Sequence, residues 1–370
     1  MERTGSRSAG GAKTLPGELF TSPAVFAEEM EKILGRRWLY VGRASRIAGP
    51  GRYLLAEAGS EGVLVVRDSA AKVRAFFNIC RHRGTLLCAE PEGALGRSIR
   101  CPYHGWTYSL EGKLIAAPNM GDVEAFDKED HSLRPVAVAE WEGGLFVHLG
   151  SDPEPFEDAF AALVGKFAAW RLSELQIAHE VVYDVAANWK LIFQNYSECY
   201  HCPSLHPILN RLTPYRNSAN DLEEGPILGG PMRMSEEGGS MTMTGARCAA
   251  PLGDVSGDDL SLVHYYTVFP NLLLSLHPDY VLVHRIQALA PDRTRIVCDW
   301  LFHPEAMAKP DFDAAPAVEF WNMTNEQDWQ VSELVQRGVA SRGYTPGPYA
   351  GLESMVAAWD REYLRAMGRS

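Results

Sequence analysis

Two short sequences, NICRHRG at 78–84 and RCPYHGWTY at 100–108, decide how the first half of this chain is built. Each supplies one cysteine and one histidine, and together they offer four candidate metal ligands: Cys80, His82, Cys101 and His104. Two thiolates and two neutral imidazoles suit a [2Fe–2S] cluster in which the cysteines bind one iron and the histidines bind the other. The sequence therefore predicts an iron–sulfur cluster held between two loops.

A structural zinc site is the alternative for the same four side chains, because two cysteines and two histidines are also a common zinc ligand set. Zinc fingers usually take both cysteines from one half of the motif and both histidines from the other, whereas each half is mixed here. Gly84 and Gly105 suit tight turns whose backbone N–H groups donate to cluster sulfur atoms. The pattern resembles a Rieske centre.

Two positions distinguish this motif from that of the respiratory-chain Rieske proteins, which carry an additional cysteine in each ligand loop and join the two by a disulfide. The corresponding positions here are Thr85 and Tyr103. The lack of this disulfide implies a lower reduction potential, which suits an electron donor to an iron that activates O₂. Cys88 is expected to be a packed thiol and not a ligand.

Composition limits the classes of partner. The chain has 370 residues, 46% of them hydrophobic, and a net charge of −12. An acidic chain without a basic run argues against a nucleic-acid partner, and no apolar stretch approaches the ~18 residues that span a membrane. Residues 1–13 lack the apolar core of a secretory signal. Of the seven cysteines, five show no disulfide framework, which predicts a reduced, cytoplasmic chain.

The hydrophobic pattern predicts an α+β protein with two domains. Residues 1–37 combine a flexible tail with a helix over about 22–37 and are expected to pack with the second domain. Short alternating apolar runs predict a small antiparallel β domain over 38–155 that holds both ligand loops. The second domain, 156–370, is expected to contain a helix at 156–169, a strand at 177–186, a helix from Asn188, loops at 217–260, strands at 262–269, 271–277, 280–289 and 293–302, and helices at 314–340 and 352–367.

A second candidate metal site lies in NWKLIFQNYSECYHCPSLHP at 188–207, which contains His201 and His206. An offset of five residues rotates by about 140° around a helix, so the two imidazoles would diverge on an ideal helix. Pro203 lies between them, breaks the regular hydrogen bonding and lets both rings turn toward one point. Structural histidines and a zinc site are the alternatives for this pair.

A carboxylate from another part of the chain would complete such a site. Asp328 is the candidate, because an acid on the largely apolar face of its predicted helix needs a partner that offsets its burial. Glu326 is the alternative. Two neutral histidines and one carboxylate form the facial triad of non-haem Fe(II) oxygenases, which leaves coordination positions open for O₂.

Two polar residues precede the histidines. Glu198 lies three residues before His201, on the same helical face, and is a candidate to accept a hydrogen bond from a metal-bound histidine or from a cluster histidine of a neighbouring subunit. An ordinary surface acid is the alternative. Asn195 faces the same site and is a candidate for hydrogen bonding near the iron or for a weak ligand position.

Together, the CxH…CxxH motif, the 188–207 segment and the acid before VQRG resemble the oxygenase α-subunit of the Rieske non-haem iron, ring-hydroxylating oxygenases. The resemblance implies a Rieske domain followed by a helix-grip catalytic domain, in which a curved antiparallel sheet wraps a long C-terminal helix. It implies that His201, His206 and Asp328 bind the mononuclear iron, and that Glu198 connects the metal centres of adjacent subunits in a homotrimer. Many naphthalene-type dioxygenases have aspartate there; glutamate within ECYHC resembles the branch acting on choline, carnitine and betaines.

The same resemblance implies a terminal oxygenase that uses O₂, a [2Fe–2S] cluster and a mononuclear Fe(II) to hydroxylate or oxidatively demethylate a small organic substrate. The sequence contains no nucleotide-binding fingerprint, so electrons are expected from a separate NAD(P)H-dependent flavin and iron–sulfur reductase, with or without a ferredoxin. The alternatives are a cis-dihydroxylating arene dioxygenase α-subunit, a Rieske-type electron carrier, and a binding protein stabilised by structural zinc.

Candidate pocket residues come from the strands expected over 262–302. Their aromatic side chains suit cation–π contact with a quaternary ammonium ion, contact with an aromatic ring, or core packing; they are Tyr265, Tyr266, Phe269, Tyr280, Trp300 and Phe302. Arg285 and His284 are candidates to meet a carboxylate, and the 217–260 region is expected to act as a lid.

Overall fold

The computed structural model describes residues 11–369, which form two compact units. The small unit comprises residues 34–161, and the large unit combines residues 11–33 with 162–369. Most of the tail expected over 1–13 lies outside the described residues. Within the described part of the chain, every helix is too short or too polar to cross a membrane.

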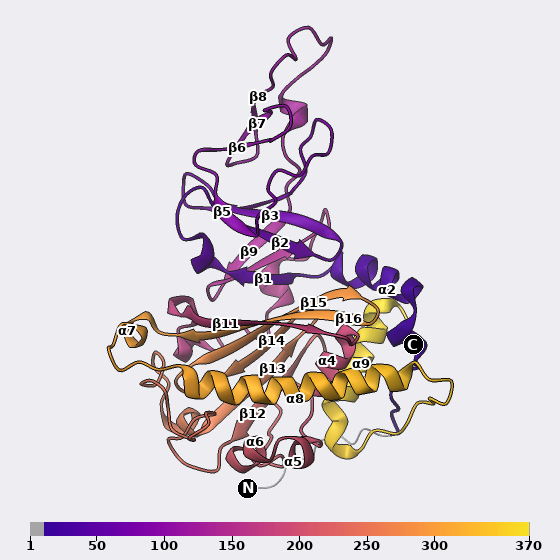
Figure 1. Ribbon diagram of the computed structural model, residues 1–370, viewed down its shortest axis with the longest axis vertical. Helices are drawn as coiled ribbons and strands as arrows, with labels where there is room; N and C mark the ends of the chain where they lie inside the picture. Colours follow the sequence, from indigo (N-terminus) through magenta and orange to yellow (C-terminus); the bar gives the residue numbers. More distant parts are fainter. Residues whose placement is uncertain (1–10, 370) are drawn as a thin grey trace. The chain divides into compact units, whose positions relative to one another are not determined.

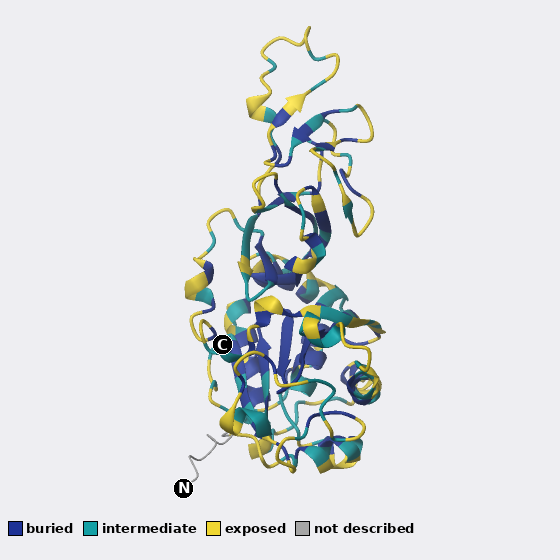
Figure 2. Ribbon diagram, turned by 90° about the vertical axis from the view of Figure 1, so that its left-hand side faces the viewer, coloured by how far each residue is buried: buried dark blue, intermediate teal, exposed yellow. Residues whose placement is uncertain are grey.

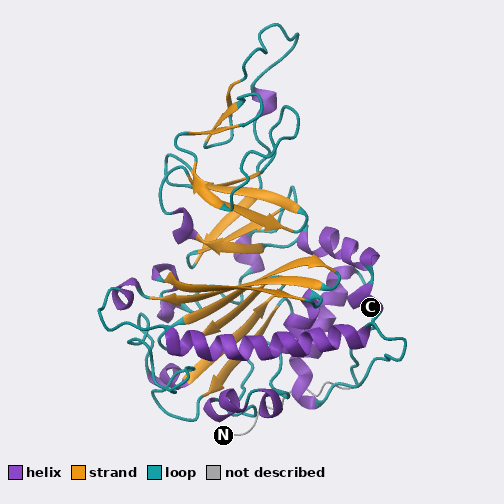
Figure 3. Ribbon diagram, viewed as in Figure 1, coloured by secondary structure: helices purple, strands orange, loops and turns teal. Residues whose placement is uncertain are grey.

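The small unit consists of three antiparallel sheets connected mainly by loops (Figure 3). The strand orders are β4–β3–β2–β5, β1–β10–β9 and β6–β7–β8. The strands are β1 (Leu39–Arg43), β2 (Arg52–Ala58), β3 (Glu61–Arg67), β4 (Val73–Phe77), β5 (Glu92–Ala94), β6 (Ser98–Arg100), β7 (Thr107–Ser109), β8 (Leu114–Ala116), β9 (Ala137–Trp141) and β10 (Gly144–His148). Residues 63–66 of β3 are fully buried, which explains their uninterrupted apolar sequence.

A six-stranded antiparallel sheet in the order β11–β16–β15–β14–β13–β12 is the centre of the large unit. Its strands are β11 (Gln176–Val185), β12 (Ile227–Arg233), β13 (Leu262–Val268), β14 (Leu272–Leu276), β15 (Val281–Ala290) and β16 (Arg293–Phe302). The last four follow one another as the meander that the sequence predicts. Buried residues are concentrated on these strands (Figure 2).

Helix α8 (Ala315–Val339) lies lengthwise across this sheet (Figure 1). Its Phe320 and Trp321 belong to the same buried cluster as Trp300 of β16. Near its middle, Asn322 accepts a hydrogen bond of 2.8 Å from the hydroxyl of Tyr183 on β11. A long helix held against a large antiparallel sheet is the helix-grip arrangement expected for the second domain.

Helix α4 (Trp189–Tyr196) leads into the segment with the two histidines. It begins where the sequence predicts, because the side chain of Asn188 accepts a hydrogen bond from the backbone N–H of Lys190 at 3.0 Å. The helix packs against α8 and α9 (Ser354–Met367). The other α-helices are α1 (Glu18–Thr21), α2 (Pro23–Glu29), α3 (Phe156–Ala159), α5 (Cys202–Leu205), α6 (Pro207–Leu212) and α7 (Pro304–Met307).

Three elements differ from the sequence-based expectation. The 217–260 region contains β12. Gly229 and Pro231 interrupt the alternation of apolar residues by which a strand is predicted from sequence. Gly229 is required there, because a Cβ atom would lie 2.0 Å from the carbonyl oxygen of Tyr265. The helix expected at 156–169 ends at Ala159. The helix expected at 22–37 is α2 followed by a π-helical turn, Met30–Leu34.

Candidate metal centres and substrate pocket

The two ligand loops of the small unit have the same local geometry. In the first, the N–H of Cys80 donates to Thr85 and the N–H of Gly84 donates back to Cys80, at 2.8 and 3.1 Å. In the second, the corresponding bonds join Cys101 to Trp106 and Gly105 to Cys101, at 2.8 and 3.2 Å. Gly84 and Gly105 have φ angles of +74° and +70°, which favour glycine. This repetition explains why both loops need glycine four residues after cysteine.

The four candidate ligands meet between these loops. Cys80 and Cys101 are both 2% exposed, and the rings of His82 and His104 lie 4.8 Å apart. Trp106 stacks parallel to His82 at 4.8 Å and holds the plane of its ring. Nδ1 of His82 is buried and has no hydrogen-bond partner among the described residues, as expected of an atom whose partner is a metal.

The chemistry of these side chains also suits a cluster. Burial, followed by the neighbouring His104 and Arg83, lowers the pKa of His82, so its imidazole is held neutral. The Tyr108 hydroxyl lies 3.3 Å from Sγ of Cys80, where it can donate to a thiolate or to a cluster sulfur. The donor set therefore fits a [2Fe–2S] cluster.

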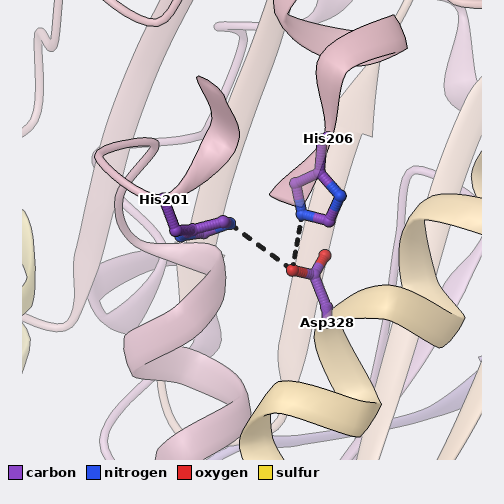
Figure 4. Close-up of side chains that lie close together, drawn as sticks. All are labelled: His201, His206 and Asp328. Carbon is purple, nitrogen blue, oxygen red and sulfur yellow. Dashed lines mark hydrogen bonds and ion pairs between the residues drawn. The ribbon is translucent and has the colours of Figure 1, made fainter. Parts of the chain in front are cut away.

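In the large unit, the chain brings His201, His206 and Asp328 together (Figure 4). Their ligand atoms all lie within 4.8 Å of one another. Oδ1 of Asp328 is 3.4 Å from Nε2 of His201 and 2.8 Å from Nε2 of His206. The helical break expected at Pro203 is not there: Pro203 lies at the start of α5, where proline is tolerated, and the N–H of His206 donates to the carbonyl of Cys202 at 2.8 Å. His201 and His206 instead flank this single turn, and the helical geometry ends at His206, which has φ −122° and ψ 66°. Glu326 is exposed and bonds Asn322 instead.

Two further side chains orient the imidazoles. Nδ1 of His201 donates to Oε1 of Glu198 at 2.5 Å, and Nδ1 of His206 donates to Oε1 of Gln327 at 2.7 Å. Each bond leaves the Nε2 atom turned toward Asp328, which is the usual arrangement around a metal-binding histidine. Sequence reasoning found Glu198 but missed Gln327; its position next to Asp328 was the available signal.

The charges at this site support one another. Burial acts to lower the pKa of His201, but the hydrogen bonds that its ring donates to Asp328 and Glu198 outweigh burial and raise it to about 10. Burial likewise acts to raise the pKa of Asp328, yet the two histidines lower it overall.

One cysteine pair corrects the expectation of a fully reduced chain. Cys199 and Cys202, on either side of His201, are joined by a disulfide. Their separation of three residues is short enough for a local turn to bring the two sulfur atoms together. Cys88 is free and buried, as expected for a packed thiol.

A pocket opens beside the candidate iron ligands. It is lined by residues of α4, the turn after it, β12, β13 and α8, among them Asn195, Glu198, His201, His206 and Asp328. Of the aromatic residues proposed from the strands, Tyr265 lines this pocket, whereas Tyr280, Trp300 and Phe302 are completely buried in the core. Tyr266 bonds Asp221, on the other side of the strand. Sequence reasoning missed the lining residues Tyr215, Met232 and Trp321.

Comparison with protein families agrees with this architecture. Residues 37–127 match the Rieske [2Fe-2S] domain, and residues 172–369 match the ring hydroxylating alpha subunit (catalytic domain). The chain therefore belongs to the Rieske oxygenases as their α, or oxygenase, subunit, with a [2Fe–2S] cluster and a mononuclear iron as cofactors. The family, the fold class and the enzymatic nature predicted from the sequence are confirmed.

Within this family the chain is similar to monooxygenases of quaternary ammonium compounds. It is 33% identical to the glycine betaine monooxygenase oxygenase subunit of Chromohalobacter salexigens, over 93% of this chain and 83% of that protein. It is 30% identical to the carnitine monooxygenase oxygenase subunit of Acinetobacter baumannii, over 90% and 87%. The crystal structure of the quaternary ammonium Rieske monooxygenase CntA matches with a TM-score of 0.83 and 26% identity, over 97% and 96% of the two chains.

Proposed function

We propose that this chain is the oxygenase component of a monooxygenase that hydroxylates or oxidatively demethylates a small quaternary ammonium compound. The observation that carries the proposal is the pocket beside His201, His206 and Asp328. Among its described lining residues are aromatic rings and two carboxylates, and none is lysine or arginine. Such a lining favours an organic cation, because aromatic faces attract positive charge and no cationic side chain of the lining opposes it.

His201, His206 and Asp328 would hold the mononuclear iron, which supplies O₂ activation when bound. Glu198 and Gln327 accept hydrogen bonds from the two Nδ1 atoms and fix each imidazole with Nε2 toward the ion. Glu198 lies in the same pocket and is our candidate for communication with the cluster of a neighbouring subunit. Asn195 lines the pocket and is the candidate for hydrogen bonding beside the iron.

Cys80, His82, Cys101 and His104 would hold the cluster, which supplies single electrons. Trp106 keeps the His82 ring in place, and the Tyr108 hydroxyl stabilises negative charge on Cys80 or on an adjacent cluster sulfur. In this assignment 38–155 is the electron-transfer domain, 156–370 is the catalytic domain, and the 1–37 extension packs with the latter.

Three features of the assembly belong to the same proposal. A separate NAD(P)H-dependent flavin and iron–sulfur reductase, with or without a ferredoxin, would deliver the electrons. A homotrimer would place the cluster of one chain beside the iron of the next, as the family resemblance implies. The cytoplasm, where NAD(P)H is available, is the proposed compartment.

The test is substrate-dependent O₂ uptake by the iron-loaded enzyme with a surrogate reductase. Glycine betaine, choline and carnitine form one panel, and benzoate and naphthalene form the other. Uptake with an ammonium compound and release of one oxidised product support the proposal. Uptake only with the aromatic panel, with a cis-dihydrodiol as product, would show instead that the chain is an arene dioxygenase subunit.

A further inference from the structure

Residues 217–222 form a short extended segment that pairs with the outer edge of β12. The N–H groups of Ala219 and Asp221 donate to carbonyl oxygens of that strand at 2.9 and 3.0 Å, and Ser218 forms a β-bridge with it. Side chains alternate between the two faces of an extended segment. Ser218 and Asn220 therefore belong to one face of the sheet, and Asp221 belongs to the other.

The face that bears Ser218 and Asn220 is a wall of the substrate pocket. Both residues line the pocket beside Gly230 of β12. The segment lies directly against this glycine, since a Cβ atom there would be 2.5 Å from Cα of Asn220. Within the described chain, neither side chain is hydrogen-bonded to another residue. A hydroxyl and an amide are thus available to a ligand, and we call these two residues the polar wall.

Polar lining residues outside this segment have other supports. Asn195 lies on α4, three residues before Glu198. Tyr215 precedes the paired segment: its hydroxyl accepts a hydrogen bond from Nε of Arg216 at 2.8 Å, and its N–H donates to Oδ1 of Asn210 at 3.1 Å. The polar wall is the part of the lining whose position depends on the pairing with β12.

The opposite face of the segment carries Asp221, which connects it to the rest of the large unit. Oδ1 of Asp221 accepts a hydrogen bond of 2.9 Å from the hydroxyl of Tyr266 on β13, and Oδ2 lies 2.6 Å from Nζ of Lys166. The Asp221 side chain is 42% exposed, so the ion pair alone stabilises little. Tyr266 is 0% exposed and gives the carboxylate a second, buried contact. Asp221 is therefore held at two points.

We infer that Asp221 is a positioning residue for substrate binding, which holds Ser218 and Asn220 where they donate hydrogen bonds to an oxygen of the substrate. This oxygen belongs to a hydroxyl or a carboxylate of the ammonium compound. The inference rests on the proposed function and adds a recognition element to the positive charge. Backbone bonds hold the segment on one side only, and the two contacts of Asp221 keep the donors preorganised for the oxygen.

The test compares the best ammonium substrate of the panel with a counterpart in which methyl groups replace the oxygen atoms. The counterparts are propyltrimethylammonium for choline, isobutyltrimethylammonium for glycine betaine and 2,4-dimethylpentyltrimethylammonium for carnitine. The readouts are KM and kcat per mononuclear iron from substrate-dependent O₂ uptake, and the Kd of both compounds from anaerobic calorimetry. The full-length enzyme, loaded with cluster and iron, is used throughout.

In Asp221→Ala we expect the KM and Kd of the substrate to rise about three- to tenfold, the size of one hydrogen bond, while kcat per iron is unchanged. The Kd of the counterpart, which has no oxygen to align, stays within about twofold of wild type. Ser218→Ala/Asn220→Ala removes the donors themselves and gives the same pattern. Adding Asp221→Ala to that variant changes nothing further, because Asp221 acts through these two residues.

Two further variants serve as controls. Asp254→Ala removes a comparable exposed ion pair of the same unit, which joins Asp254 to Arg171 at 2.9 Å, and Asp254 lies outside the pocket lining. It keeps the wild-type KM and Kd. Lys166→Met removes the ion pair but leaves the hydrogen bond from Tyr266. It gives a smaller change in the same direction, and it replaces Asp221→Ala in the test if that variant does not fold.

The outcomes separate the inference from the proposed function. If the wild-type enzyme oxidises no ammonium compound, both are wrong. If it oxidises one but Asp221→Ala keeps the wild-type KM and Kd, or lowers only kcat, the role of Asp221 is wrong and the proposed function stands. The same conclusion follows if the counterpart loses affinity equally, if the triple variant binds more weakly than Ser218→Ala/Asn220→Ala, or if Asp254→Ala raises KM to the same extent.

Discussion

A buried ion pair at the start of α4 determines how firmly the histidine segment is held. Oε1 of Glu29, on α2, lies 2.5 Å from Nζ of Lys190, and both side chains are 0% exposed. The same carboxylate accepts hydrogen bonds from Trp189 Nε1 at 2.9 Å and from the Tyr363 hydroxyl at 2.7 Å. Three helices, α2, α4 and α9, therefore meet at one fully buried charge.

We predict that Glu29→Gln destabilises the large unit by about 3–5 kcal/mol, because it leaves the Lys190 ammonium buried without its counter-ion. Lys190→Met should cost a similar amount by leaving the carboxylate of Glu29 unpaired. The double variant Glu29→Gln/Lys190→Met contains neither charge; the glutamine oxygen can accept from Trp189 Nε1, and its amide N–H can donate to the Tyr363 hydroxyl oxygen. Its stability should therefore return to within about 1–2 kcal/mol of wild type.

Thermal unfolding followed by circular dichroism measures this cycle. For a unit of this size the single variants should lower Tm by about 10 °C, and the double variant should recover most of that loss. The fraction of iron retained by each variant at a fixed temperature gives a second readout close to the site. A Tm change below about 3 °C in both single variants, or a double variant no more stable than the singles, would refute the reasoning.

Three other predictions concern the metal centres and one buried acid. Asp328→Asn should lower substrate-dependent O₂ uptake by more than about 100-fold and reduce the mononuclear iron content, while the visible spectrum of the cluster persists, because the candidate cluster ligands lie in the other unit. Cys101→Ser should abolish that spectrum but leave the mononuclear iron measurable by elemental analysis, whereas Cys88→Ser should retain both metal centres. Burial raises the pKa of Asp360 to about 6, so the folded chain keeps a proton that the unfolded chain releases. Stability should therefore fall by up to about 3 kcal/mol as pH rises from about 4 to 6, and Asp360→Asn should remove this slope from a series of unfolding midpoints.

For each of these three predictions, one outcome would contradict it. Full iron content in Asp328→Asn would show that this carboxylate is not a ligand. Loss of the cluster in Cys88→Ser to the same degree as in Cys101→Ser would contradict the ligand assignment. An identical pH dependence in wild type and Asp360→Asn would assign the titration to another group.

Much of the site was predictable because its parts are local. The cluster motif repeats one loop with a cysteine and a glycine at fixed spacing, and backbone hydrogen bonds within each loop are sufficient to form it. The start of α4 was also predictable, since Asn188 caps its own helix. The helical break was expected at Pro203, but the helical geometry ends at His206, immediately before Pro207.

Other features depended on partners far away in the sequence. Strand β12 was missed because Gly229 and Pro231 weaken the local signal, and the strand exists through its pairing with β13. The disulfide between Cys199 and Cys202 was missed because three-residue spacing alone does not distinguish a bonded pair from two thiols. Most of the aromatic residues proposed for the pocket belong to the core, because sequence patterns do not show which face of a strand a cavity lies on.

The sequence by itself determined the family, the two ligand loops and the order of strands β13 to β16, because each of these is encoded by residues within a few turns or one hairpin of one another. Only the tertiary structure brought Asp328 beside His206 from 122 residues away, turned Glu326 to solvent and left the hydroxyl of Tyr265 without a partner. The physical reason is that these outcomes depend on the rotation of α8 against the sheet and on the register of its strands, and both are fixed by packing across the whole unit.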